Sequence, residues 1–150
     1  LTFDDGYKNF NEIVKPILEK YHFKATCFVI GKHVEDDRKE FLKKDDLNNN
    51  EYISYYSHSY DLHHKNRINE LSLDELNHDF NHDLIDHTYF AYPYGLSNKE
   101  IFDLLKKQDV HLAFEYNNFH DMTSLDHPYL IPRYMIVDIM PDFYIHYIYQ

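Results

Sequence analysis

The sequence of 150 residues contains no tryptophan and only one cysteine. Because a disulfide needs two cysteines, none can form within the chain, and cysteine usage leaves the compartment open. Cys27 lies in the apolar stretch KATCFVI, which is typical of a buried strand. A cysteine in such a stretch serves most often as a small hydrophobic side chain.

Basic residues and long apolar runs are also scarce. The chain has 15 Lys and Arg against 26 Asp and Glu, which gives a formal net charge of −11. Nucleic acid binding needs clustered Lys and Arg, so this balance argues against such a partner and favours a neutral or cationic one. No uncharged apolar run is long enough to span a membrane, and no signal peptide is visible.

Hydrophobic and aromatic residues, by contrast, are plentiful. A hydrophobic content of 43% over this length is enough for one domain with a real core. Aromatic residues reach 17%, and fifteen of them are tyrosines. A tyrosine offers a flat face and a hydroxyl group, which suits contact with sugars; a tyrosine-rich core and rim is the alternative.

Strand and helix patterns alternate along the chain, with no composition break to mark a second domain. Repeated βα units of this kind imply a parallel sheet or barrel. Strands are expected over 1–3, 24–31, 51–59, 87–95, 110–116 and 129–137, helices over 9–21, 72–85, 97–108 and 142–149, and a weakly helical stretch over 38–50.

The first expected helix, over 9–21, is amphipathic, with Pro16 as a local distortion. Its helical spacing places six apolar side chains on one face: Phe10, Ile13, Val14, Ile17, Leu18 and Tyr21. We therefore expect this helix to pack on the sheet.

Candidate ligands and acids gather where the expected strands end. In parallel α/β folds, functional residues lie at the carboxyl ends of the strands. Asp4 and Asp5 follow the first strand, and His58 and His63 follow the third. Two imidazoles and one carboxylate make a three-ligand site with open positions, as a catalytic zinc or a similar divalent ion requires. The Asp-Asp-Gly run is also ordinary turn chemistry, and this alternative stays open.

Four motifs together resemble a known family. TFDDG, HSYDLH, AYPYG and IPRYMI, in this order, resemble motifs of the polysaccharide deacetylases of carbohydrate esterase family 4, which share the NodB homology domain. The six-residue histidine motif, the lack of an Arg before PY, where Phe90 stands, and IPRYMI point to the branch of poly-β-1,6-N-acetylglucosamine N-deacetylases. The resemblance implies an α/β fold, a distorted (β/α) barrel of the NodB type, over residues 1–150, with the N-terminal part of the domain missing.

The resemblance also implies a metal site. Asp5, His58 and His63 would hold a divalent metal ion, with zinc foremost and cobalt or nickel as alternatives. His64 is the obvious competitor for the place of His63, but only His63 matches the family pattern.

Three further residues would take part in the reaction that the resemblance implies. Asp4 would be the general base that takes a proton from the attacking water. The backbone N–H near Tyr94 would stabilise the oxyanion. Arg133 is the candidate to hold Asp4 ionised through a charge-assisted hydrogen bond, and pairing with any nearby carboxylate is the structural alternative.

The implied activity is metal-dependent removal of N-acetyl groups from poly-β-1,6-N-acetylglucosamine of a biofilm matrix. The protein would be secreted or attached to the cell surface of a Gram-positive bacterium. Deacetylation of peptidoglycan or chitin is the alternative within enzymes, and an inactive family member that binds glycans is the alternative from another class.

His78 and His82 form a rival metal site, because a spacing of four residues on a helix can clamp a metal. Their segment lacks the Glu of a zincin motif and is rich in Asn and Asp. This composition favours a solvated helix face instead.

A late Leu-x-His motif, which would supply the general acid, is not recognisable in the sequence. Departure of a sugar amine is slow unless an acid protonates it, and histidine is the natural donor near neutral pH. In the branch that the chain resembles, this motif precedes the first Asp-Asp strand, so we expect the acid before Leu1. Within the chain, His111, His127 and His146 are the alternatives.

Overall fold

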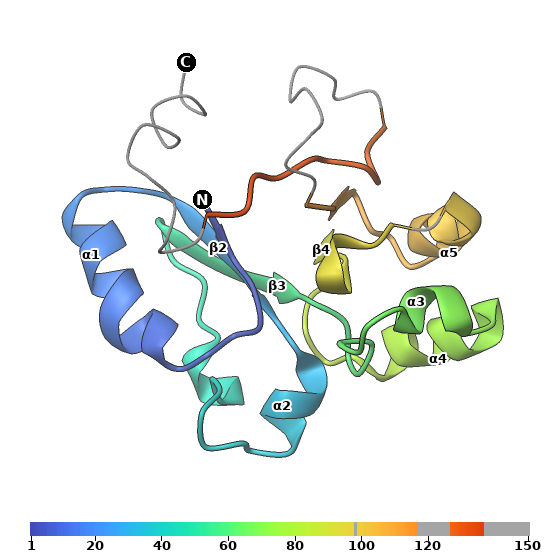
Figure 1. Ribbon diagram of the computed structural model, residues 1–150. Helices are drawn as coiled ribbons and strands as arrows, with labels where there is room; N and C mark the ends of the chain where they lie inside the picture. Colours follow the sequence, from blue (N-terminus) through green and yellow to red (C-terminus); the bar gives the residue numbers. More distant parts are fainter. Residues whose placement is uncertain (98, 117–126, 137–150) are drawn as a thin grey trace.

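The structure, a computed structural model, describes residues 1–97, 99–116 and 127–136 (Figure 1). At its centre lies a five-stranded sheet whose neighbouring strands follow one another in sequence and pair in parallel. This topology confirms the α/β fold expected from the alternating patterns. The strands are β1 (Thr2–Phe3), β2 (Ala25–Val29), β3 (Ile53–Ser57), β4 (Tyr89–Ala91) and β5 (Leu112–Phe114).

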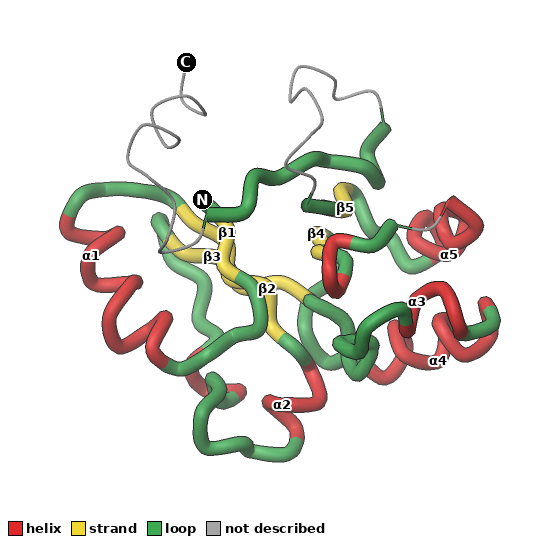
Figure 2. Tube along the Cα trace, in the orientation of Figure 1, coloured by secondary structure: helices red, strands yellow, loops and turns green. Residues whose placement is uncertain are grey.

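Short helices surround the sheet, with α1 on one side and α3, α4 and α5 on the other (Figure 2). None of the helices among the described residues is both long and apolar enough to cross a bilayer. The helices are α1 (Lys15–Lys20), α2 (Gly31–Glu35), α3 (Arg67–Glu70), α4 (Leu73–His82) and α5 (Phe102–Lys107), with 3₁₀ turns at Lys44–Asp46, Pro93–Gly95 and Lys99–Ile101.

The expected helix over 9–21 is broken into a π turn, Phe10–Val14, followed by α1. The N–H of Lys15 donates to the carbonyl of Phe10 at the end of the π turn. A π turn inserts an extra residue and changes the phase of the helix, so the predicted apolar face does not continue. Phe10 and Leu18 are buried, whereas the prediction was wrong for Ile13, Ile17 and Tyr21, which are exposed.

Two other predicted elements also need correction. The stretch 38–50 contains only one 3₁₀ turn, and the helix of this region, α2, begins earlier, at Gly31. In the expected strand 129–137, Ile131 forms an isolated parallel bridge with Phe114, and the described residues extend no further as a strand. Pro132 follows directly, and a proline cannot donate to a strand ladder. The terminal helix over 142–149 lies outside the described residues.

Two clusters of buried side chains pack on the sheet. One lies between the sheet and the α3 to α5 side, and its members include Leu76, Phe90, Tyr92 and Leu105. The other includes Phe10, Leu18, Cys27 and Tyr55, which join α1 and its preceding turn to β2 and β3. Cys27 is a buried free thiol, as its strand pattern predicted.

The sheet is curled, so that its two edge strands approach each other. The segment 127–136 is bridged to β5 at Ile131 and then runs to the start of β1, as the orange-red trace in Figure 1 shows. There Arg133 donates to the hydroxyl of Thr2, at 3.2 Å, and to Asp4. An Arg that follows one edge strand thus contacts the opposite edge strand, which confirms the distorted barrel.

Gly6 provides a test of the turn that follows β1. Its φ of +75° lies in the left-handed region, and a Cβ atom would come within 2.8 Å of Val29 Cγ1. Gly6→Ala should therefore lower the free energy of unfolding by roughly 1–2 kcal/mol from backbone strain alone. Denaturant unfolding measures this loss, with the exposed Asn69→Ala on α3 as the control.

Candidate metal centre

Three predicted ligands meet at the carboxyl ends of β1 and β3. Nε2 of His63 lies 3.1 Å from Oδ1 of Asp5, and Nε2 of His58 lies 3.6 Å from the same oxygen. One ligand atom from each residue falls within 4.8 Å of the other two. Among the described residues, no other group of three His, Cys, Asp or Glu side chains comes together in this way.

The Asp-Asp-Gly run is both a turn and part of this centre. Asp5 and Gly6 have φ values of 74° and 75°, so the chain reverses through two left-handed residues. The turn directs Asp5 toward His63, while Asp4 lies 3.9 Å from Nε2 of His58 through its Oδ2 atom. The two interpretations of the sequence therefore describe the same structure.

The surroundings of His58 favour a neutral imidazole that could bind a metal through Nε2. Its side chain is buried, and Nδ1 lies 2.8 Å from the carbonyl oxygen of Ala91. Since a carbonyl only accepts, Nδ1 carries the proton and Nε2 presents its lone pair to the centre. Burial lowers the pKa of His58, which also favours the neutral imidazole.

Asp5 and His63 form the more polar half of the centre. The hydrogen bond to Asp5 raises the pKa of His63. Burial pushes the pKa of Asp5 upward, but the hydrogen bond and the charges of the histidines outweigh it, so the pKa lies below its ordinary value. His63 is therefore the side chain that pairs with the Asp5 carboxylate, at 3.1 Å.

The donor set fits a divalent transition metal. Two imidazole nitrogens and one carboxylate oxygen, from three residues, suit zinc and leave a position open for chemistry. His64 does not join them, because its side chain is 68% exposed and lies beside Asp61. The ring of Tyr94 stacks on His63, with centroids 4.8 Å apart, and covers one side of the ligand set.

Arg133 binds Asp4 through both branches of its guanidinium group. Nη1 donates to Oδ1 at 2.7 Å, and Nη2 donates to Oδ2 at 2.9 Å. The guanidinium also lies over the ring of Phe28, 5.4 Å from its centroid. Such two-pronged, charge-assisted pairs fix a carboxylate in position.

The loop between the two histidines depends on Asp79, which sequence reasoning missed. This residue lies on α4 with 7% of its surface exposed, and its carboxylate accepts the N–H groups of Tyr60 and Asp61 at 3.0 and 2.8 Å. In the sequence, Asp79 is one polar residue among several on a helix. Its burial follows only from the position of the loop above it.

A second buried carboxylate supports the same loop. Asp83 accepts from the hydroxyl of Ser57 at 2.5 Å, and the Ser57 oxygen in turn accepts from the N–H of Ser59 at 2.9 Å. Burial raises the pKa of Asp83 to about 6. Ser59 itself has a φ of 74°, and its hydroxyl accepts from the N–H of Leu62.

The rival pair, His78 and His82, lies on the exposed side of α4. Their rings stack with centroids 5.9 Å apart, and His82 also contacts Tyr60. No third ligand joins them among the described residues. The histidine pair is therefore part of a solvated helix face, as its composition favoured.

The alternative general acids lie elsewhere. His111 precedes β5, and its side chain is 59% exposed beside Asp109. His127 packs on Phe102 and Tyr129, and His146 lies outside the described residues.

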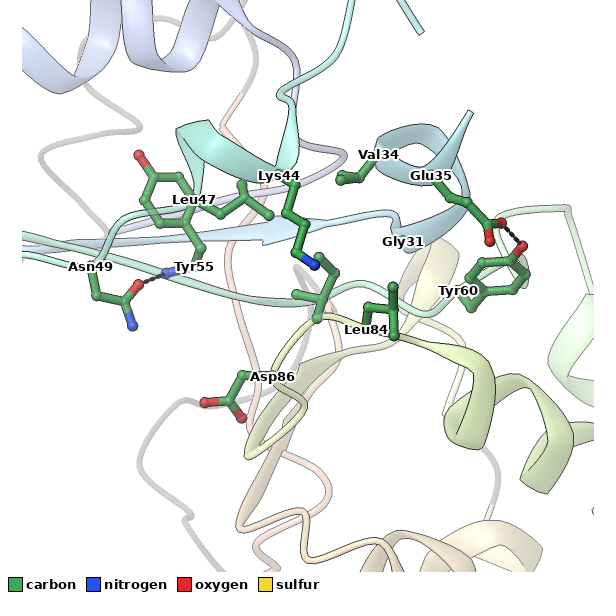
Figure 3. A pocket seen from close by; sticks show the side chains of 11 residues that line it. Gly31, Val34, Glu35, Lys44, Leu47, Asn49, Tyr55, Tyr60, Leu84 and Asp86 are labelled. Atoms are coloured by element: carbon green, nitrogen blue, oxygen red, sulfur yellow. Dashed lines mark hydrogen bonds between the residues drawn. The ribbon is translucent and has the colours of Figure 1, made fainter. Parts of the chain in front are cut away.

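The cavity in Figure 3 is separate from this centre. It encloses about 430 Å³ between α2, the segment 44–49 and the residues that precede β4. Val34, Leu47 and Leu84 line it, and the side chain of Lys44 extends into it. None of the three ligands lines this cavity, so the centre lies on a different part of the surface.

Asp79→Asn tests whether the Asp79 carboxylate supports the histidine loop, residues 58–63. An amide keeps one acceptor and turns an NH₂ group toward a backbone donor, so we expect zinc affinity to fall roughly 10–100-fold. Zinc competition with a chelating dye measures the change. His78→Ala on the same helix is the control and should bind zinc like the wild type; equal affinities in all three proteins would contradict the assignment.

Comparison with known proteins extends the similarity over most of the chain. The family model for polysaccharide deacetylase matches residues 1–113. Poly-beta-1,6-N-acetyl-D-glucosamine N-deacetylase of Staphylococcus aureus is 28% identical over 159 residues, which cover 92% of this chain and 54% of the relative. The enzyme of that name from Staphylococcus epidermidis is 26% identical, with 91% and 53% covered. The chain thus spans about half the length of these curated relatives.

Solved structures share the fold at lower identity. A de-N-acetylase from Aggregatibacter actinomycetemcomitans superposes with a TM-score of 0.80 at 17% identity, covering 98% of this chain and 73% of the other. IcaB from Ammonifex degensii superposes with a TM-score of 0.75 at 21% identity, with 91% and 66% covered. With a family model matched over residues 1–113 and this fold, the chain belongs to the polysaccharide deacetylase family.

Proposed function

We propose that the protein is a metal-dependent deacetylase that removes N-acetyl groups from poly-β-1,6-N-acetylglucosamine. One observation carries this proposal: Asp5, His58 and His63 converge within 4.8 Å, beside an Asp4 carboxylate held by Arg133. The names of the staphylococcal relatives support the choice of polymer. Zinc is the proposed metal, because the ligands are two nitrogens and one oxygen.

The residues of the chain divide the chemistry between them. A divalent ion held by Asp5, His58 and His63 would supply a Lewis acid that polarises the acetamide carbonyl and acidifies water. Asp4 accepts the proton of the attacking water, since Arg133 holds its carboxylate in position through two hydrogen bonds. The backbone N–H of Tyr94 donates to the oxyanion that develops on the carbonyl oxygen.

The sugar amine leaves once it has gained a proton, and acetate is the second product. His111 is exposed beside Asp109, and the half-buried His127 packs against Phe102, which supports neither as the acid. We therefore propose that the acid is a histidine of the full-length protein outside residues 1–150. The span of the relatives, about twice that of this chain, is compatible with such a residue.

The proposed place of action is outside the cell, in the matrix or at the cell surface. The staphylococcal relatives are named for a polymer of N-acetylglucosamine, and we propose that this protein acts on such a polymer outside the cell.

Acetate release by the full-length, zinc-loaded protein tests the function. We expect the fastest release from β-1,6-linked N-acetylglucosamine polymer in a panel that also contains chitin oligomers and peptidoglycan. Faster release from either of the other substrates would reassign the polymer. Binding to the polymer without any release of acetate would identify an inactive glycan-binding protein.

Substituting the two neighbouring aspartates one at a time separates their roles. Asp4→Asn keeps the shape of the side chain but cannot accept the proton, so turnover should fall roughly 10²–10⁴-fold while metal stays bound. Asp5→Ala should lose both metal and activity. Metal analysis and acetate release measure the two effects, and equal metal loss in both variants would make Asp4 a ligand.

Histidine substitutions test the ligand set in the same protein. His58→Ala should remove most of the bound zinc, because two remaining protein ligands hold a labile ion weakly. His64→Ala, next to His63 but directed toward Asp61, is the matched control and should keep its metal. Metal content measured after dialysis distinguishes the two variants, and the opposite result would move the site to His64.

A further inference from the structure

Three aromatic side chains form a continuous surface near the metal centre. The ring centroids of His33 and Phe41 lie 3.9 Å apart. Those of Phe41 and Tyr7 lie 4.6 Å apart, in a stacked pair with an interplanar angle of 26°. We call His33, Phe41 and Tyr7 the aromatic row.

Backbone pairing holds the aromatic row in place. Tyr7 and Phe41 form an isolated antiparallel bridge. The N–H of Lys8 donates to the carbonyl of Glu40 at 3.0 Å, and the N–H of Leu42 donates to the carbonyl of Gly6 at 2.8 Å. Leu42 is 1% exposed and anchors the segment in the core. The stack is therefore a fixed part of the fold, because both of its segments are tied to each other.

The aromatic row and the candidate metal centre share the chain segment that follows β1. Tyr7 comes two residues after the ligand Asp5, and the Gly6 carbonyl between them accepts one of the bonds that hold Phe41 in place. His33 belongs to α2, which begins where β2 ends, at the same edge of the sheet. The residues that follow β1 and β2 therefore place the aromatic row and the candidate ligand Asp5 at the same edge of the sheet.

Tyr7 leaves 47% of its surface exposed, although it lies in a well-anchored turn. On the opposite flank, after β4, Tyr94 is 39% exposed and stacks on His63. Exposed aromatic side chains thus follow both β1 and β4, whose carboxyl ends lie at the edge of the sheet that carries the candidate ligands. The ligand set alone could hold a small molecule. The additional aromatic side chains suit an extended substrate.

We propose that the aromatic row is a sugar-binding subsite, which holds a pyranose ring of the substrate chain next to the residue that loses its acetyl group. This proposal rests on the proposed function. The C–H face of a pyranose is apolar and matches the face of Tyr7, while the tyrosine hydroxyl can bond to a sugar hydroxyl. A neutral or cationic glucosamine chain is also compatible with the net charge of −11.

Binding and kinetics of the full-length, zinc-loaded protein test the subsite. A hexamer of β-1,6-linked glucosamine has no acetyl group to lose, so calorimetry measures its binding without turnover. Tyr7→Ala should weaken this binding about threefold to tenfold, as expected for the loss of one stacked ring. Tyr7→Phe keeps the ring and should retain most of the affinity. Tyr21→Ala, an exposed tyrosine after α1, is the control and should bind like the wild type.

Acetate release from acetylated oligomers of increasing length gives the second measurement. For Tyr7→Ala, the loss in kcat/KM should grow with chain length, mainly through KM, because only longer substrates reach the row. Phe41→Leu keeps an apolar anchor, removes the stacked ring and should show the same dependence on length. It provides the test should Tyr7→Ala be too unstable to measure.

Two outcomes separate failure of the subsite from failure of the proposed function. Wild-type protein that releases no acetate from any β-1,6-linked oligomer overturns the proposed function. An active wild type overturns the subsite alone if the Tyr7→Ala and Phe41→Leu variants bind the hexamer normally, or lose the same factor at every chain length.

Discussion

The parallel alignment of the strands is the constraint on which the candidate site depends. Because β1, β2, β3 and β4 run in one direction, their carboxyl ends meet at one edge of the sheet. Asp5 follows β1 and His58 follows β3, more than fifty residues later, yet their ligand atoms lie 3.6 Å apart. Even the carbonyl that fixes the tautomer of His58 belongs to the last residue of β4, Ala91.

The curl of the sheet brings the positive charge of Arg133 next to the two carboxylates of the candidate centre. Asp4 and Asp5 place two carboxylates side by side, and their mutual repulsion must be offset. Arg133 offsets the charge of Asp4 through two hydrogen bonds, and His63 offsets that of Asp5 through one. The two carboxylates therefore stand in different environments, which is the physical basis for giving them different roles. The hydrogen bonds that link the segment after β5 to the end of β1 also orient the proposed base.

The histidine loop shows how buried acids can serve a site that they do not enter. Asp79 and Asp83 are buried, and each accepts hydrogen bonds that hold residues between or beside the two histidines. An unpaired buried carboxylate would be costly, so these bonds make the loop conformation and the burial of the acids depend on each other. We therefore expect a change at either acid to disturb the loop that carries the two candidate histidine ligands.

The sequence by itself determined the order of the five strands of the sheet and the ligand candidates, because strand ends, turn residues and motifs are local features. It predicted Asp5, His58 and His63, whose meeting point follows from parallel topology. It was wrong about Ile13, Ile17 and Tyr21, since a π turn shifts the helical phase, and about a full strand at 129–137, where Pro132 intervenes. Only the tertiary structure decided that Asp79 is buried beneath the loop and that Arg133 reaches Asp4 across the curled sheet. The contact between Asp61 and Asp79 spans 18 positions of the sequence, and the contact between Asp4 and Arg133 spans 129. Contacts of this kind depend on how the chain folds back on itself, which no local pattern encodes.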